Sequence, residues 1–183
     1  MVRLQRDECA LLVIDVQERL LPVIHTAKEI ERRVVTAVGG ARILGLPVLA
    51  TEQYPKGLGR TTAPVAAALR GIAPVEKTSF SCCGVEAIDH AIAQHAPAVI
   101  LVAGIETHVC VMQTCLDLLE QRITPVLLAD CVGSRHPHDH QVAVERLRDA
   151  GVLVTTLESA LFELLGVAGT DEFKQVSGLV KPL

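Results

Sequence analysis

Short apolar runs alternate with longer segments of helical periodicity along most of the 183-residue chain. The apolar runs are rich in β-branched residues, which is typical of strands buried on both faces of a parallel sheet. They predict six strands, over residues 9–14, 47–50, 73–76, 98–103, 125–128 and 152–155. The periodic segments predict helices over residues 27–44, 64–69, 84–94, 108–120 and 158–165, and one that ends near 150. Residues 170–183 form a tail without a firm assignment.

This alternation predicts an α/β protein with three α/β/α layers, in which right-handed crossovers cover both faces of an open parallel sheet. We expect residues 1–183 to form a single domain, because the chain is long enough for one substantial core and contains no linker or repeat. In a six-stranded sheet of order 3-2-1-4-5-6, the strand order reverses between the first and fourth strands. Ligands bind beyond the carboxyl ends of the strands at such a point.

Three reactive side chains follow the ends of predicted strands. Asp15 ends the first strand, Lys77 ends the third, and Cys110 lies in the first helical turn after the fourth, with Thr107 as the expected N-cap. Free N–H groups and the helix dipole favour an anion there, so we expect a stabilised Cys110 thiolate. Together the three residues predict nucleophilic catalysis, in which Asp15 moves the proton and Lys77 stabilises the anion.

Each residue also fits a simpler interpretation. Most free cysteines are small buried hydrophobes, a carboxylate at a strand end often caps a loop, and an isolated lysine is usually solvated. A binding or scaffold protein that keeps the fold without turnover is therefore the competing hypothesis. A nuclease is disfavoured, because a net charge of −4 and an aromatic content of 2% leave no basic stripe and no stacking platform for nucleic acid.

The composition limits location and partners. No apolar run approaches the roughly 20 residues of a membrane span, and residues 1–8 are too charged for a signal peptide. We therefore expect a cytoplasmic protein with no membrane partner. The apolar helices favour a homo-oligomer.

Cysteine and histidine spacing argues against metal sites. The six cysteines show no framework spacing and are expected to be reduced thiols. Pro137 interrupts the group His136, His138 and His140, so we expect a loop entering a helix, in which Asp139 caps the helix or the loop lines a pocket. No cofactor is expected.

Several blocks of sequence resemble one known family. They are LLVIDVQ at 11–17, TEQYPKGLG at 51–59, EKTSF at 76–80, GIETHVCV at 104–111, ADCVGSR at 129–135 and SRHPHDH at 134–140. Nearly end to end, the chain resembles the isochorismatase-like cysteine hydrolases, the superfamily of nicotinamidase and N-carbamoylsarcosine amidohydrolase. Within this superfamily, the blocks at 51–59 and 134–140 are similar to those of one branch, the isochorismatase-domain hydrolases.

The resemblance implies the six-stranded fold and a triad of Asp15, Lys77 and Cys110. It also implies a cis peptide bond between Ile105 and Glu106, with the backbone amides of Glu106 and Cys110 as the oxyanion hole. The expected activity is cleavage of a C–N bond in a small amide-like substrate through a thioester on Cys110.

The chain also departs from the family pattern. Nicotinamidases carry a D-x-H metal motif after the second strand, where this chain has Thr51, Glu52 and Gln53. A metal held in that manner is therefore not expected, and classical nicotinamidase activity is disfavoured. Aromatic residues that enclose a planar substrate are scarce. The residues expected to contact the substrate are Gln17, Gln53, Tyr54, Phe80 and His108.

Overall fold

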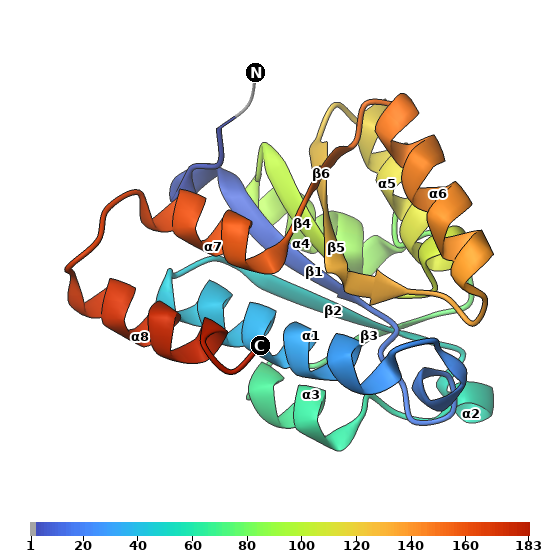
Figure 1. Ribbon diagram of the computed structural model, residues 1–183. Helices are drawn as coiled ribbons and strands as arrows, with labels where there is room; N and C mark the ends of the chain where they lie inside the picture. The colour runs from blue at the N-terminus through green and yellow to red at the C-terminus, as the bar shows by residue number, and fades with distance from the viewer. Residues whose placement is uncertain (1–2) are drawn as a thin grey trace.

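The computed structural model describes residues 3–183 and has a six-stranded sheet at its centre (Figure 1). The strands are β1 (Cys9–Ile14), β2 (Val48–Gln53), β3 (Val75–Lys77), β4 (Val99–Ile105), β5 (Thr124–Gly133) and β6 (Leu153–Thr155). Their order is β3-β2-β1-β4-β5-β6, and all five pairings between them are parallel. The predicted fold class and strand order are confirmed, including the reversal between β1 and β4.

Helices cover both faces of the sheet (Figure 1). They are α1 (Ala27–Ile43), α2 (Pro55–Leu58), α3 (Ala63–Leu69), α4 (Glu86–His95), α5 (Met112–Glu120), α6 (Pro137–Asp149), α7 (Leu157–Leu165) and α8 (Asp171–Val180). Shorter turns are the 3₁₀ segments η1 (Arg6–Glu8) and η2 (Leu21–Val23) and the π turn η3 (Thr107–Val111). Buried side chains of α1, α3, α7 and α8 form one core cluster, and those of α4, α5 and α6 form a second.

The central strand β1 explains why the strands read as continuous apolar runs. All six of its residues are buried. Leu11 and Val13 pack into the cluster under α1, whereas Leu12 and Ile14 pack into the cluster under α5. Because successive side chains of a strand point to opposite faces, a strand covered on both faces needs an apolar residue at every position.

Two strands run further than their apolar residues predict. β2 continues through Thr51, Glu52 and Gln53, which were expected in a loop, because β3 pairs with these residues. The polar side chains are tolerated there since each is hydrogen-bonded inside the protein. β5 continues to Gly133 after a shift in its register with β4.

The unassigned tail contains helix α8. Thr170 accepts a hydrogen bond from the Phe173 N–H at its start, and Val176 and Val180 are buried in the cluster under α1. An ion pair of 2.8 Å joins Glu172 to Arg6 near the other end of the chain. Among residues 3–183, none of the helices has the length and hydrophobicity needed to cross a bilayer.

Candidate active site

Asp15 and Lys77 meet at the carboxyl edge of the sheet. Asp15 follows β1 directly, with a backbone in the left-handed region (φ 54°), and its N–H donates to the Thr51 carbonyl at 3.2 Å. Lys77 is the last residue of β3, two strands away. Its Nζ lies 2.7 Å from Asp15 Oδ2, and neither side chain is exposed to solvent. The topology therefore brings together two charged groups that are 62 residues apart in the chain.

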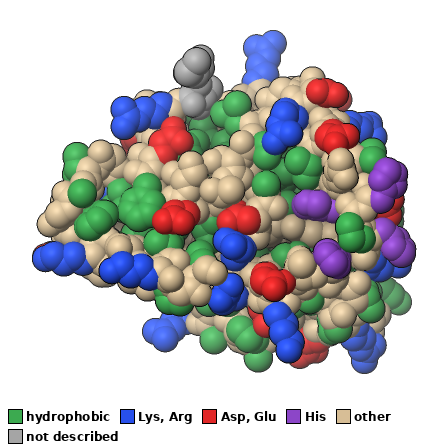
Figure 2. Space-filling view, viewed as in Figure 1, with side chains coloured by type: hydrophobic (Ala, Val, Ile, Leu, Met, Phe, Trp, Pro, Cys, Tyr) green, Lys and Arg blue, Asp and Glu red, His purple; other side chains and the backbone are tan. Residues whose placement is uncertain are grey.

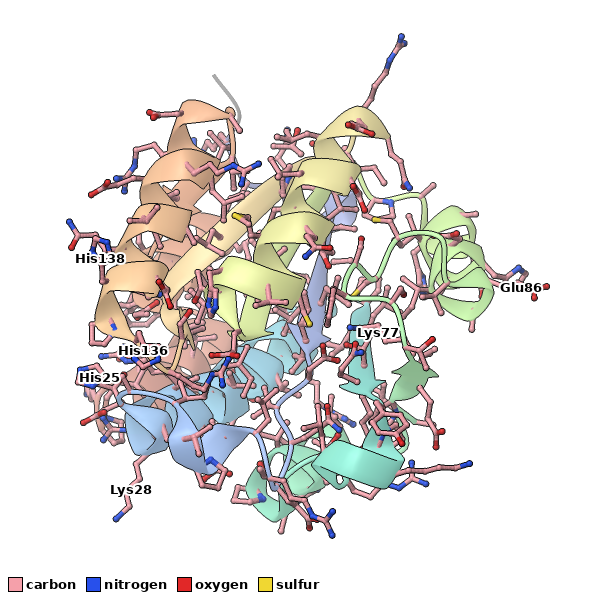
Figure 3. The ribbon with its side chains drawn as sticks, turned by 90° about the vertical axis from the view of Figure 1, so that its right-hand side faces the viewer. His25, Lys28, Lys77, Glu86, His136 and His138 are labelled. Carbon is pink, nitrogen blue, oxygen red and sulfur yellow. The ribbon has the colours of Figure 1, made fainter. Side chains whose placement is uncertain are left out.

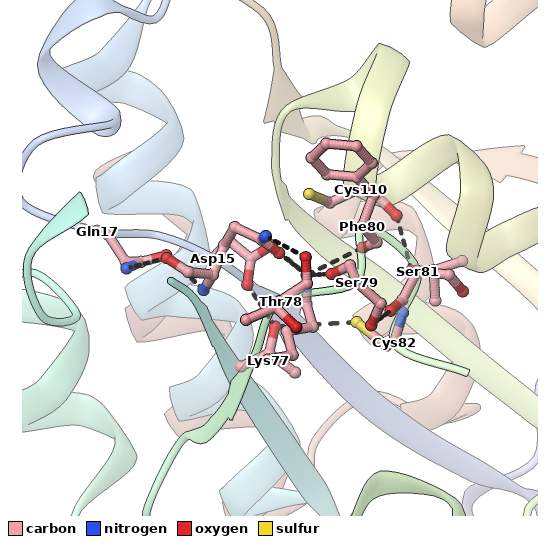
Figure 4. Close-up of polar contacts among 12 residues, drawn as sticks. Asp15, Gln17, Lys77, Thr78, Ser79, Phe80, Ser81, Cys82 and Cys110 are labelled. Atoms are coloured by element: carbon pink, nitrogen blue, oxygen red, sulfur yellow. Dashed lines mark hydrogen bonds and ion pairs between the residues drawn. The ribbon is translucent and has the colours of Figure 1, made fainter. Parts of the chain in front are cut away.

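The Lys77 ammonium is surrounded by oxygen atoms (Figure 4). Besides Asp15, it donates to Gln53 Oε1 at 2.8 Å, to the Phe80 carbonyl at 2.9 Å and to the Ser79 carbonyl at 3.2 Å. An ammonium has three donor hydrogens, so these four acceptors saturate it. Lys77 is thus held in place, and it fixes the start of the loop that follows β3.

Cys110 lies in η3, the π turn between β4 and α5. Its side chain is buried, with the residue 4% exposed, and the Asp15 carboxylate is close enough to act on the thiol electrostatically. Burial, and next the negative charge of Asp15, raise the pKa of the Cys110 thiol far above its ordinary value, although Lys77 opposes them. Burial and the Asp15 charge therefore both favour the protonated thiol, which runs against the expectation of a stabilised thiolate.

The helix terminus also differs from the prediction. Glu106 occupies the N-cap position, and Thr107 is the first residue of the turn. The Thr107 hydroxyl instead lies 3.0 Å from Nδ1 of His140. The Ile105–Glu106 peptide bond is cis, as the resemblance implied.

Gly104 allows β1 and β4 to approach closely beside the site. Its φ of +123° is accessible to glycine, and a Cβ at this position would overlap the backbone carbonyl oxygen of Ile14. Ile14 immediately precedes Asp15, and the turn with Cys110 begins three residues after Gly104. The close approach of the two strands therefore sets the separation between carboxylate and thiol.

The segment before α6 fastens the Cys110 turn from the outside. Glu106 Oε2 accepts hydrogen bonds from Arg135 N at 2.9 Å and Arg135 Nε at 3.2 Å. His108 Nδ1 lies 2.9 Å from the Ser134 hydroxyl. The Thr107 hydroxyl contacts His140 in the first turns of α6, so Glu106, Thr107 and His108 are each held by residues 134–140.

Two glutamines expected to contact the substrate are engaged within the protein. Gln17 is fully buried, and its Nε2 donates to the carbonyls of Gln53 and Gly59 while its Oε1 accepts from the Gln53 N–H. Gln53 Nε2 donates to the Thr78 carbonyl, and its Oε1 accepts from Lys77. Their hydrogen-bonding capacity is therefore used to hold the strand ends.

The aromatic candidates are accessible. Tyr54 is 54% exposed and Phe80 is 52% exposed. Tyr54 lines a cavity of about 550 Å³ that reaches the site at Lys77; its other lining residues are Pro55, Lys56, Glu76, Thr78, Ser79, Gly84 and Val85. Neither Asp15 nor Cys110 lines this cavity. His108 lines a different cavity, of about 220 Å³, between the Cys110 turn and α6.

The histidine-rich segment spans the start of α6. Pro137 is the first residue of α6 and His136 is its N-cap, so the expectation that Asp139 caps the helix is wrong. His25, His136 and His138 lie at the surface along the left edge of Figure 3, away from Lys77, and the histidines visible in Figure 2 lie towards its right-hand side. No group of three or more potential metal ligands is present among residues 3–183.

The structure adds residues that sequence reasoning did not place in the site. The Thr51 hydroxyl donates to Asp15 Oδ1 at 2.8 Å, and Cys82 Sγ lies 3.8 Å from the same hydroxyl. The Thr114 hydroxyl accepts from the Cys82 N–H at 3.0 Å and donates to the Cys110 carbonyl at 2.7 Å. The one signal in the sequence was that Thr51 stands where nicotinamidases carry a metal ligand.

Comparison with known proteins gives a consistent result. A family model described as the Isochorismatase domain matches residues 9–159. The chain is 35% identical over 184 residues to the secreted isochorismatase effector Isc1 of Phytophthora sojae (strain P6497), covering 98% of this chain and 87% of that protein. It is 39% identical over 170 residues to isochorismatase domain-containing protein 1 of Salmo salar, covering 91% of this chain. The match spans 59% of that longer relative.

Among solved structures, the MAR1 ribonuclease of Caenorhabditis elegans superposes with a TM-score of 0.91 at 34% sequence identity. The match covers 98% of this chain and 92% of that structure. The similarity extends beyond the residues of the site to the whole arrangement of sheet and helices.

Proposed function

We propose, for a chain that belongs to the isochorismatase family, that Cys110 is the nucleophile of a hydrolase that cleaves a C–N bond in a small amide-like substrate. The observation that carries this proposal is the fully buried ion pair of Lys77 and Asp15, both of which act electrostatically on the buried Cys110 thiol. Buried charges are costly, and a carboxylate beside a thiol is the arrangement that general-base catalysis requires.

In the first half of the reaction, Cys110 is acylated by the substrate. Its sulfur attacks the substrate carbonyl carbon as Asp15 accepts the thiol proton, so no free thiolate accumulates. This sequence suits a thiol whose pKa is raised by burial and by the carboxylate itself. The C–N bond then breaks, the amine takes the proton from Asp15, and a thioester remains on Cys110.

In the second half, water regenerates the enzyme. Asp15 accepts a proton from the water molecule that attacks the thioester carbonyl, and the C–S bond breaks as the carboxylic acid leaves. The Cys110 sulfur recovers the proton held by Asp15. In both halves we assign the backbone N–H groups of Glu106 and Cys110 as donors to the tetrahedral oxyanion, since such donors supply a large share of catalysis in acyl transfer.

Lys77 acts chiefly by holding Asp15 and the following loop. Its four oxygen contacts leave no free hydrogen to follow a moving substrate. Its ammonium binds Asp15 Oδ2 at 2.7 Å and so holds the carboxylate in place as the proton acceptor. We therefore assign Lys77 to electrostatic support of the base and not to direct contact with the oxyanion.

Substrate contacts fall to the exposed aromatic residues. Tyr54 follows β2 and its N–H donates to the Lys77 carbonyl at 2.8 Å, whereas Phe80 lies three residues after Lys77. Both aromatic side chains are about half exposed. Gln17 and Gln53, which are engaged by the protein, are reassigned to positioning the strand ends. His108 is reassigned to holding the Cys110 turn against Ser134.

One observation favours a second candidate, RNA hydrolysis: the 34% identity to the MAR1 ribonuclease structure over 98% of this chain. The net charge of −4 argues against strong RNA binding. A fluorescent single-stranded RNA incubated with wild type and Cys110→Ala tests it. Cleavage that survives in Cys110→Ala would place the RNase activity outside the proposed thiol site.

We further propose that the whole chain forms one domain that associates with copies of itself in the cytoplasm. The packing of α7 and α8 into the cluster under α1 supports the single domain. Exposed apolar side chains outside the proposed substrate contacts support self-association; they are Val23, Val142, Leu153 and Val167. Sedimentation analysis tests the self-association, and fractionation of the source cells tests the cytoplasmic location.

The activity is tested by ammonia release from a panel of primary amides and N-carbamoyl amino acids. Cys110→Ala should lower kcat by about 10³-fold or more, whereas Cys9→Ala, which alters a buried thiol at the opposite end of β1, should retain activity. Asp15→Asn should accumulate less acyl-enzyme in intact-mass spectra with p-nitrophenyl acetate as the probe. Absence of both turnover and a Cys110 acyl adduct would favour a binding or scaffold protein instead.

A further inference from the structure

We propose that Thr51 is a positioning residue that acts through Asp15: its hydroxyl stabilises the carboxylate by a hydrogen bond and holds it in position beside Cys110. The catalytic meaning of this role rests on the proposed function, while the effect on Asp15 does not. Thr51 Oγ1 donates to Asp15 Oδ1 at 2.8 Å, and the residue is buried. Asp15 Oδ2 is occupied by Lys77 at 2.7 Å, so each carboxylate oxygen has its own donor.

Strand β2 presents matched groups to the ion pair. Thr51 and Gln53 are two residues apart in one strand, so their side chains point to the same face. Thr51 donates to the carboxylate, and Gln53 accepts from the ammonium at 2.8 Å. A neutral donor therefore stands beside the negative partner and a neutral acceptor beside the positive one.

The register of the sheet makes this contact reproducible. Thr51 is paired with Ile14 in the β1–β2 ladder, and its backbone carbonyl accepts the Asp15 N–H at 3.2 Å. Backbone and side chain of Thr51 thus both bind Asp15. Because Thr51 is buried and its backbone is paired within the sheet, its side chain has little conformational freedom. The hydroxyl is therefore already ordered before substrate binds.

The direction of the hydrogen bond is also fixed. Thr51 gives its hydrogen to Asp15, so its oxygen is left to accept from the Cys82 thiol, whose sulfur lies 3.8 Å away. Burial raises the pKa of Cys82, which keeps that group protonated. The titratable groups facing Asp15 are Lys77 from β3, Cys82 from the following loop and Cys110 from η3.

Loss of the hydroxyl should make Asp15 easier to protonate, because a hydrogen bond to a charged group favours the charged form. We expect the ionisation midpoint of Asp15 in Thr51→Val to rise by about one pH unit or more. Valine keeps the β-branched shape that suits a buried strand, and Thr51→Ser restores the donor and should return the midpoint to the wild-type value.

The measurement is a ¹³C NMR titration of aspartate carboxyl carbons, with the Asp15 signal assigned from Asp15→Asn. Thr36→Val is the matched control, since Thr36 is a buried threonine of α1 whose hydroxyl donates only to the Arg32 carbonyl. An Asp15 midpoint that moves no more in Thr51→Val than in Thr36→Val overturns the proposal. So does a signal that stays ionised over the whole folded pH range in Thr51→Val.

A second readout separates this proposal from the proposed function. The rate of Cys110 alkylation by iodoacetamide is followed against pH by peptide mass spectrometry, with partly exposed Cys83 as the internal reference. The acid limb for Cys110 should move to higher pH in Thr51→Val and return in Thr51→Ser. If the NMR midpoint shifts but Cys110 never reacts faster than Cys83, the role of Thr51 stands and the nucleophile assignment fails.

Discussion

The Lys77 ammonium lies 2.7 Å from the Asp15 carboxylate, and both side chains are completely withdrawn from solvent. Neither charge has water to stabilise it, so each depends on the other and on neighbouring dipoles. Thr51 supplies a donor to Asp15, and Gln53 with two loop carbonyls supplies acceptors to Lys77. The ion pair is therefore the centre of a buried network that joins β1, β2, β3 and the loop beyond.

Removing one partner of this pair should cost more than removing both. Lys77→Met leaves Asp15 as an unpaired buried charge and should lower the free energy of unfolding by about 3–5 kcal/mol. Asp15→Asn should cost a similar amount, and the double variant should cost less than either single variant. Urea unfolding of the four proteins measures the coupling; single-variant costs that add to within about 0.5 kcal/mol would contradict the buried pair.

The close approach at Gly104 predicts a severe effect of one added methyl group. Gly104→Ala places a Cβ against the Ile14 backbone, so the strands must separate, and a loss above about 4 kcal/mol is expected. Gly151 also has a positive φ, of +98°, but nothing lies within 4 Å of its Cβ position. Gly151→Ala should therefore cost only about 1–2 kcal/mol of backbone strain.

Thermal unfolding of the two glycine variants measures the difference. Because Gly104 sets the spacing of Asp15 and Cys110, Gly104→Ala should also lose Cys110 reactivity toward iodoacetamide. Equal losses of stability in the two variants would show that positive φ, and not the strand contact, determines the cost.

Arg60 binds two glutamates whose surroundings differ. Glu52 has a side chain 5% exposed and is also bound by the Thr61 N–H and hydroxyl, whereas the Glu76 side chain is 56% exposed. Burial of Glu52 opposes ionisation, but the bonds from Thr61 and Arg60 prevail and lower its pKa.

Neutralising Glu52 should therefore cost more than neutralising Glu76. We expect Glu52→Gln to cost about 1–3 kcal/mol at neutral pH and Glu76→Gln less than about 1 kcal/mol. The Glu52 contribution is present above the pKa of an unfolded glutamate, about 4.3, and is lost as pH falls through the lower folded value. Urea unfolding at neutral and acid pH checks the order, and a larger loss in Glu76→Gln would contradict it.

The buried thiols predict a loss of stability at alkaline pH. Burial raises the pKa of Cys9 to about 11 and that of Cys83 to about 12, whereas an unfolded thiol titrates near 8.5, roughly. Between these values the unfolded chain loses protons that the folded chain keeps, so stability falls as pH rises. Each thiol contributes a slope of about 1.4 kcal/mol per pH unit in its window.

Cys9→Ala isolates one of these contributions. Between about pH 8.5 and 10.5, the free energy of unfolding in urea should fall with pH less steeply in Cys9→Ala than in wild type. The expected difference is the contribution of one thiol, about 1.4 kcal/mol per pH unit. Parallel slopes for wild type and Cys9→Ala would mean that Cys9 titrates normally in the folded protein.

Hydrophobic periodicity was sufficient to predict the layers and the positions of Asp15, Lys77 and Cys110. A strand covered on both faces must be apolar at every position, so the polar residue that ends the run marks the sheet edge. The extension of β2 was missed because its last residues are polar and pair with β3. The extension of β5 was missed because it follows a shift in the register with β4. Helix α8 was missed because its few apolar residues stabilise a helix only when they pack into the core cluster beside α1.

The sequence by itself determined the alternation of strands and helices and the residue types at the sheet edge, since both are local properties of the chain. Only the tertiary structure decided what those residues contact. It gave Asp15 the Thr51 hydroxyl, engaged Gln17 and Gln53 inside the protein, and buried Cys110 deeply enough to raise the pKa of its thiol. Hydrogen bonding and desolvation act through space, between segments that lie far apart in the sequence, so their balance is set only when the sheet has assembled.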